Sequence, residues 1–197
     1  LGDFSSDDKM LGPISKGGIG DAFVQLDQKE DALDYYEKAF NANVNDFTTP
    51  LYLMKAARVA IAIGQNDKAL GYFKRTLKIR ELIGDKFDLG NILFHIGMVY
   101  SEKGEYDKGL DYTIRSNNIA QNIEDKYGLG FSFNLIGEAY RNLGDYKKSA
   151  ENLKSAFLDA LNEMTGIDSA TLIENRILKY DGRPFRSDEL KKQLLRI

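Results

Sequence analysis

His95 is the only histidine in this 197-residue chain, so a histidine-dependent active site or metal site would depend on it alone. Asn91 and Glu102 fall on about the same face of a helix through His95. Three scattered side chains are too few for a metal site or a catalytic triad, and a lone histidine more often packs or hydrogen-bonds. We therefore expect no catalytic residue and no bound metal.

A glycine-rich stretch, SKGGIG at 15–20, superficially resembles a loop that binds phosphate. Such loops need the order G-x-x-x-x-G-K-[ST] or G-x-G-x-x-G after a strand, and this stretch has neither. Paired carboxylates placed for acid–base chemistry are not identifiable either. The sequence predicts a non-enzymatic protein without a cofactor, so the elements that carry these residues become the main source of information.

The charge and composition exclude several classes of function. With 27 basic and 30 acidic residues the net charge is -3, which creates no field to attract nucleic acid or an anionic membrane. The chain has no cysteine, and no apolar run approaches the roughly 20 residues that span a bilayer. We expect a soluble chain with no nucleic-acid or membrane contact. The cytoplasm is favoured, and the periplasm stays open if a signal or anchor preceded Leu1.

A five-residue pattern occurs four times along the chain. The copies are 19–23, 56–60, 96–100 and 136–140. The second residue of each copy is small: Gly20, Ala57, Gly97 and Gly137. The intervals between these small residues are 37, 40 and 40 positions, and repeats of this length are typical of solenoids.

A turn residue follows each copy, and a second apolar segment with helical spacing follows the turn. The turn residues are Asp27, Gly64, Gly104 and Gly144. Each unit is therefore expected to be helix, turn, helix. The predicted helices run at about 13–26, 29–42, 50–63, 66–83, 86–103, 106–123, 126–143 and 146–163. Pro13 and Pro50 are expected in the first turn of a helix, where proline is favoured.

Two segments resemble the tetratricopeptide repeat (TPR) family. LIGEAYRNLGDY at 135–146 resembles the first-helix and turn pattern of that family, and DALDYYEKAF at 31–40 resembles its second-helix pattern. The resemblance implies an all-α fold, a right-handed α-α superhelix (TPR solenoid) of four helix hairpins plus a degenerate C-terminal capping hairpin. The last two full repeats are similar to the 40-residue long-repeat subclass. The first 77 residues are more similar to TPR proteins associated with bacterial secretion, which leaves an engineered chimera open.

The resemblance also divides the chain. Residues 1–12 are expected to be an N-terminal tail or the end of a preceding element, and 165–197 the degenerate fifth hairpin or cap. The four hairpins between them are expected at about 13–46, 50–83, 86–124 and 126–164.

In TPR arrays, one face of each first helix forms an inner, concave wall along which the ligand lies. Matching columns imply that this wall contains Met54, Lys55, Arg58, Asn91, Phe94, His95, Met98, Phe131, Asn134, Leu135, Glu138 and Arg141. Its apolar middle suits an amphipathic helix or an apolar peptide. The alternative is that a neighbouring helix or the C-terminal cap covers these residues. The clamp with which some TPR domains hold a terminal carboxylate is not expected, because Lys55 is the one suitable cation in the matching columns.

The leading functional hypothesis is a non-enzymatic protein–protein interaction scaffold that binds a peptide or partner helix in its concave groove. Two alternatives stay open. One is a regulatory or sensor TPR domain that responds to a small ligand or a signalling peptide. The other is a structural oligomerisation module, which is compatible with a homo-oligomer.

Overall fold

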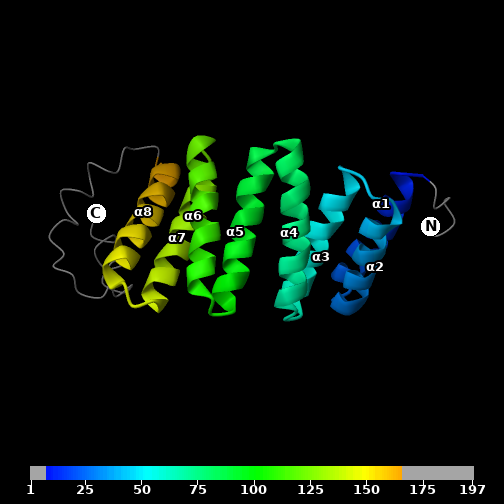
Figure 1. Ribbon diagram of the computed structural model, residues 1–197, viewed down its shortest axis with the longest axis horizontal. Helices are drawn as coiled ribbons and strands as arrows, with labels where there is room; N and C mark the ends of the chain where they lie inside the picture. The colour runs from blue at the N-terminus through cyan, green and yellow to red at the C-terminus, as the bar shows by residue number, and fades with distance from the viewer. Residues whose placement is uncertain (1–7, 166–197) are drawn as a thin grey trace.

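The computed structural model describes residues 8–165, and the regular structure within this range is helical. The helices are α1 (Leu11–Gln25), α2 (Lys29–Ala42), α3 (Thr48–Ala62), α4 (Asn66–Ile83), α5 (Lys86–Glu102), α6 (Tyr106–Asn122), α7 (Lys126–Asn142) and α8 (Tyr146–Thr165). They form four hairpins that stand side by side along one axis (Figure 1). The predicted all-α solenoid of helix hairpins is confirmed.

Each helix end lies within two residues of its predicted position. The N-terminal tail is shorter than expected, because α1 begins at Leu11 and therefore includes residues that were assigned to the tail. The expected capping hairpin, apart from Thr165 at the end of α8, lies outside the part of the chain that the structure describes. Between residues 8 and 165, no helix is both long and apolar enough to cross a bilayer.

Pro13 and Pro50 each occupy the third position of a helix. The first four N–H groups of a helix have no partner inside it, so a proline there removes no hydrogen bond. Both prolines thus lie in the first turn as predicted, although their helices begin two residues before the predicted starts.

Each hairpin turns at one residue with a left-handed backbone. These residues are Asp27 (φ 56°), Gly64 (φ 75°), Gly104 (φ 76°) and Gly144 (φ 84°), the four predicted turn residues. Two junctions between hairpins use the same conformation, at Gly84 (φ 78°) and Glu124 (φ 56°). Glycine adopts this region without strain, whereas other residues pay roughly 1–2 kcal/mol. Asp27 and Glu124 therefore carry backbone strain, whereas the corresponding turns and junction elsewhere in the described chain have glycine.

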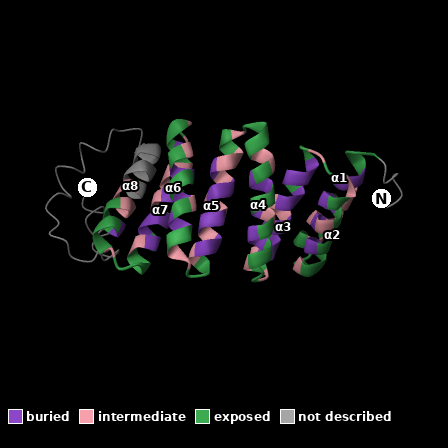
Figure 2. Cartoon of the chain, in the orientation of Figure 1, coloured by how far each residue is buried: buried purple, intermediate pink, exposed green. Residues whose placement is uncertain are grey.

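Small residues let the two helices of a hairpin approach each other closely. A Cβ atom on Gly97 would lie 2.2 Å from Oγ1 of Thr113 and 3.0 Å from the carbonyl oxygen of Gly109. Thr113 is fully buried, and its hydroxyl donates to that carbonyl over 2.8 Å. The corresponding position holds Tyr36 in the first hairpin and Phe73 in the second. The smaller threonine thus marks the place where α5 and α6 come closest, and the buried residues line the helix contacts (Figure 2).

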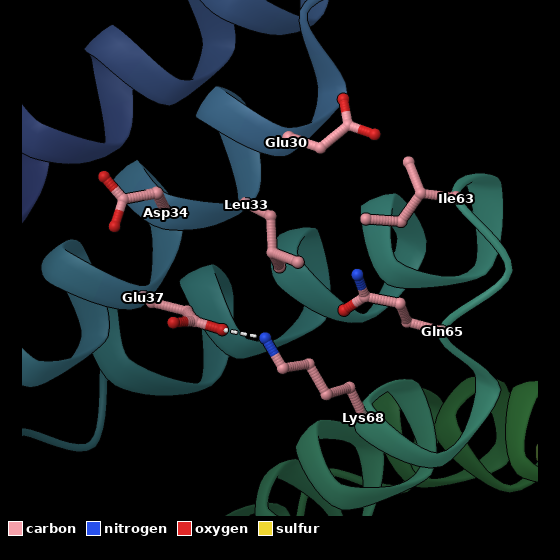
Figure 3. A pocket seen from close by; sticks show the side chains of 7 residues that line it. All are labelled: Glu30, Leu33, Asp34, Glu37, Ile63, Gln65 and Lys68. Atoms are coloured by element: carbon pink, nitrogen blue, oxygen red, sulfur yellow. Dashed lines mark hydrogen bonds and ion pairs between the residues drawn. The ribbon is translucent and has the colours of Figure 1, made fainter.

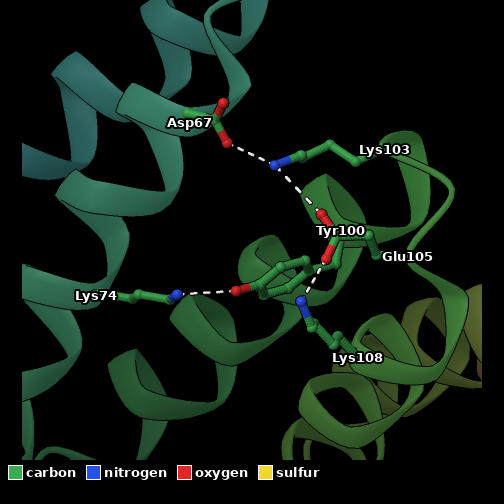
Figure 4. A network of polar contacts seen from close by, with 6 residues as sticks. All are labelled: Asp67, Lys74, Tyr100, Lys103, Glu105 and Lys108. Carbon is green, nitrogen blue, oxygen red and sulfur yellow. Dashed lines mark hydrogen bonds and ion pairs between the residues drawn. The ribbon is translucent and has the colours of Figure 1, made fainter.

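The second and third hairpins are joined at their turn edge by a polar network (Figure 4). The ammonium of Lys103 lies 2.5 Å from Asp67 and 3.3 Å from Glu105. Lys74 donates to the hydroxyl of Tyr100 over 2.8 Å. The hydrogen bond with Asp67 is the main cause of the raised pKa of Lys103. This junction therefore relies on exposed ion pairs in addition to apolar packing.

The third and fourth hairpins meet through buried polar side chains. The Asn117 amide donates to the Ser132 hydroxyl over 2.7 Å, and that hydroxyl donates to the carbonyl of Leu129 over 3.0 Å. Within the third hairpin, Ser116 of α6 donates to the carbonyl of Gly90 of α5 over 2.7 Å. Because buried polar groups are costly when unpaired, the bond from Asn117 to Ser132 favours one particular fit of α7 against α6.

Candidate functional site

The odd-numbered helices form the inner side of the array. α1 contacts α3 and α5 contacts α7, whereas the even-numbered helices make no comparable contact with one another within residues 8–165. Helices on the inside of an arc lie closer together than those on the outside. The predicted wall residues from residue 54 to residue 141 all belong to α3, α5 and α7.

The structure places a continuous row of rings on this wall. The His95 ring stacks on Phe73, with centroids 5.4 Å apart and an interplanar angle of 4°. Phe94 lies edge-on to His95 at 5.7 Å and next to Phe131 at 6.2 Å. Phe73 is fully buried and Phe131 is 63% exposed. This ring row, as it is called below, therefore runs from the core of the second hairpin out to solvent on the fourth. Its members are Phe73, His95, Phe94 and Phe131.

His95 is held neutral within this row. Burial is the main cause that lowers its pKa to about 4, and the positive charge of Arg58 acts in the same direction. Its Nδ1 atom is buried and has no hydrogen-bond partner in the described chain. An uncharged imidazole between two phenyl rings acts as a flat, largely apolar surface with one polar atom.

The N-terminal part of the wall is closed by an ion pair. The Lys55 ammonium lies 2.6 and 2.7 Å from the two carboxylate oxygens of Asp21, and the Tyr36 hydroxyl donates to Asp21 over 2.6 Å. Burial, followed by this hydrogen bond, raises the pKa of Tyr36 well above its usual value. Lys55 is thus already neutralised, which leaves it poorly placed to bind a ligand carboxylate.

Arg58 is the wall cation that remains available. Its side chain is exposed and forms no ion pair with another described residue. Arg141, by comparison, approaches Glu138 at 3.9 Å, a long and exposed pair. Arg58 belongs to α3 and influences the charge state of His95 on α5.

The other predicted wall residues differ in exposure. Met54, Asn91 and Met98 are half-buried, and Asn134 is exposed. Leu135 is only 8% exposed, so it belongs to the core and not to the open wall where it was expected. A leucine one turn after Phe131 continues the apolar stripe in the sequence, but packing of α7 in the array buries it.

Two contacts of the site could not be predicted from the sequence. Phe73, a core residue of α4, stacks on His95. Lys55 was expected on the wall, but its ion pair with Asp21 was not anticipated. No motif could have revealed these contacts, because each joins residues from different hairpins or different helices.

Two hollows in the described surface lie away from the ring row. One, of about 240 Å³, is lined by residues of α2, of α4 and of the turn between α3 and α4, and Glu37 pairs there with Lys68 at 3.2 Å (Figure 3). The other, of about 270 Å³, is lined by residues of α4, α5 and α6. Among the described residues, no group of three acidic or histidine side chains is arranged to hold a metal ion.

Comparisons with known proteins agree with the stacked helix hairpins of this structure. The family model described as tetratricopeptide repeat matches residues 15–45 and 132–157, which lie in the first and fourth hairpins. No curated protein matches the sequence.

Several solved structures share the fold at low identity. BtubC from P. vanneervenii is 17% identical with a TM-score of 0.70, covering 94% of this chain and 72% of its own. A signal transduction ATPase with a tetratricopeptide repeat sensor, from Pyrococcus horikoshii, is 23% identical with a TM-score of 0.71, covering 83% of this chain and 26% of its own.

A third solved structure, a Rap protein complexed with competence and sporulation factor, is 20% identical with a TM-score of 0.64, covering 84% of this chain and 47% of its own. The chain thus spans less than half the length of two of these three proteins. The matched stretches identify tetratricopeptide repeats in the first and fourth hairpins, and these neighbours show that the stacked hairpins have the fold of a tetratricopeptide repeat solenoid.

Proposed function

We propose that this protein is a non-enzymatic interaction scaffold that binds a peptide or partner helix along the inner wall of α3, α5 and α7. The observation that carries the proposal is the ring row, in which the exposed Phe131 and the half-buried Phe94 are backed by the stacked pair of His95 and Phe73. Large apolar side chains that are exposed but supported by the core lose little freedom when a ligand covers them.

The charges on the wall suggest what such a ligand carries. Lys55 is neutralised by Asp21, whereas Arg58 has no described ion pair. Arg58 lies on α3, the odd-numbered helix before α5. A ligand with a carboxylate next to an apolar side chain would pair the carboxylate with Arg58 and pack the apolar side chain on the ring row. The proposed ligand is therefore a segment with a large apolar residue close to an acidic one.

The comparisons supply supporting context. The Rap protein of similar fold is recorded in complex with competence and sporulation factor. The hollows of about 240 and 270 Å³ do not include the ring row.

A sensor function is the second candidate, favoured by the packing of α3 and α5. These two helices make no contact comparable to that between α5 and α7. A ligand that touches Arg58 on α3 and Phe94 on α5 would bridge this junction and draw the two hairpins together. X-ray scattering with and without ligand tests this function, since a sensor changes its maximum dimension and a passive scaffold keeps it.

The proposal is tested with peptides selected from a random display library on the 197-residue chain. The selected peptide is then titrated against Phe94→Ser and Phe131→Ser by calorimetry. Loss of a buried aromatic contact of about 1.5–3 kcal/mol should weaken binding by about 10- to 100-fold. Tyr146→Ser is the matched control, because Tyr146 is 72% exposed and lies at the turn edge, away from the wall. Equal affinities for all four proteins would reject the groove.

A further inference from the structure

The edge of the array at which the odd-numbered helices begin carries a repeated capping motif. Side-chain oxygens of Asp8, Asn45, Asp85 and Asp125 accept backbone N–H groups two or three residues further on. A large apolar residue follows each cap by two positions. These residues, named here the edge ladder, are Met10, Phe47, Phe87 and Tyr127.

The edge ladder follows the repeat of the fold and is open to solvent. Its members are 39%, 67%, 60% and 70% exposed. Their separations are 37, 40 and 40 residues (47 - 10, 87 - 47 and 127 - 87), the same intervals as those of the packing residues. Each hairpin therefore contributes one member, next to the start of its odd-numbered helix, and these helices begin at the upper edge of the array in Figure 1.

Packing among residues 8–165 does not account for this ladder. A hydrophobic residue that staples a helix start precedes the cap and packs against the first turn. The edge-ladder residues instead follow the cap and stay exposed. Without Phe131 of the wall, ten of the sixteen exposed large hydrophobic side chains of the described chain lie near this edge, so the apolar surface is concentrated there. Such concentration on a soluble surface marks an interface.

Opposite charges beside the two middle members indicate the occupant. Asp46 precedes Phe47, and Lys86 precedes Phe87. Both charged side chains are exposed, and neither has an ion pair in the part of the chain that is described. If a second ladder runs in the opposite direction, its third member lies against the second member of the first ladder. Phe47 then meets Phe87 of the second copy, and Asp46 meets Lys86 of the second copy.

We propose that the edge ladder is a self-association surface, through which two copies of this chain pair antiparallel about a two-fold axis between the second and third hairpins. Two-fold symmetry forms each Phe47–Phe87 and Asp46–Lys86 contact twice. The end members, Met10 and Tyr127, meet each other at both ends of the paired ladders. The pairing uses none of the groove residues and is independent of the groove proposal.

Sedimentation velocity of the 197-residue chain, over a range from about 1 µM to about 500 µM, measures the pairing. The wild type should shift from monomer to dimer with concentration, and Phe87→Glu should stay monomeric. Tyr146→Glu is the control, because it adds the same charge at another exposed aromatic residue, on the opposite edge. Circular dichroism checks that each variant keeps its helices. A wild type that stays monomeric throughout, or a dimer that survives Phe87→Glu, would overturn the proposal.

A charge swap tests the register. Asp46→Lys places lysine against lysine twice, and should raise the dimer dissociation constant by about tenfold or more. Adding Lys86→Asp restores two opposite-charge contacts, so the double variant should return to near the wild-type value. A double variant that stays as weak as Asp46→Lys would overturn the antiparallel pairing.

Discussion

Two glycines in the middle of helices should respond in opposite ways to the same substitution. Gly71 in α4 is exposed, and a Cβ atom there would meet nothing within 4 Å. Gly97 in α5 faces Thr113 and the carbonyl of Gly109, with a Cβ atom at 2.2 and 3.0 Å from their oxygens. Both positions gain helix propensity when glycine becomes alanine, but only Gly97→Ala must push two helices apart.

The magnitudes follow from these distances. Gly71→Ala should stabilise the fold by about 1 kcal/mol, the usual advantage of alanine in a helix interior. Gly97→Ala gains the same amount but overpacks the core at a cost of about 2–3 kcal/mol, because one of the atoms in the way is backbone. The net effect is a loss of about 1–2 kcal/mol. The two variants should therefore differ by about 2–3 kcal/mol in the free energy of unfolding.

Urea unfolding followed by far-ultraviolet circular dichroism measures this difference, provided that the slope m stays the same in the three proteins. Adding Thr113→Ala to Gly97→Ala removes the contact at 2.2 Å and leaves the one at 3.0 Å, so it should recover about 1 kcal/mol in a double-mutant cycle. If Gly97→Ala proved as stabilising as Gly71→Ala, the small residues would not be setting the helix spacing, and the packing argument would be refuted.

Three further outcomes are expected. Glu124→Gly should raise the free energy of unfolding by about 1 kcal/mol in urea, because Glu124 has a φ of 56° and glycine carries no strain there, and Gly84→Glu should lower it by a similar amount. Asn117→Ala should lower the free energy of unfolding by about 1–2 kcal/mol through loss of its buried hydrogen bond to Ser132, whereas Asn118→Ala, at an exposed position, should change it little. Stability should fall between pH 6.5 and pH 4, because His95 has a pKa of about 4 when folded and 6.5 when unfolded, so protons bind the unfolded chain first. The contribution of neutral His95 to stability is complete above pH 6.5 and is lost as the pH falls toward 4. His95→Gln should remove about 2–3 kcal/mol of the pH dependence of the free energy of unfolding. Equal pH profiles of unfolding for the wild type and His95→Gln would contradict the burial of His95.

The repeat geometry could be predicted from the sequence because the residues that set it act locally. Gly64, Gly104 and Gly144 mark turns by their own backbone freedom, and helical spacing is a property of short segments. Asp27 was predicted as a turn residue for its position alone, and the structure confirms it at φ 56°.

The chemistry of the wall was less predictable because it depends on contacts between helices. The columns of the repeat placed Lys55 and Leu135 on the wall, but they could not show that Asp21 neutralises the first and that packing buries the second. The lowered pKa of His95 likewise arises from burial beside Phe73, which lies on another helix. Neighbours of this kind are set by the curvature of the whole array.

Nuclear magnetic resonance of the His95 ring tests groove binding most directly, since this ring is the only histidine signal of the chain. The chain is labelled at histidine and titrated with the peptide selected on it, while calorimetry gives the overall dissociation constant. Groove binding predicts that the ring resonances shift and saturate with that same constant, and that Phe131→Ser weakens both together. A peptide that binds by calorimetry but leaves the His95 resonances unchanged would contradict the account.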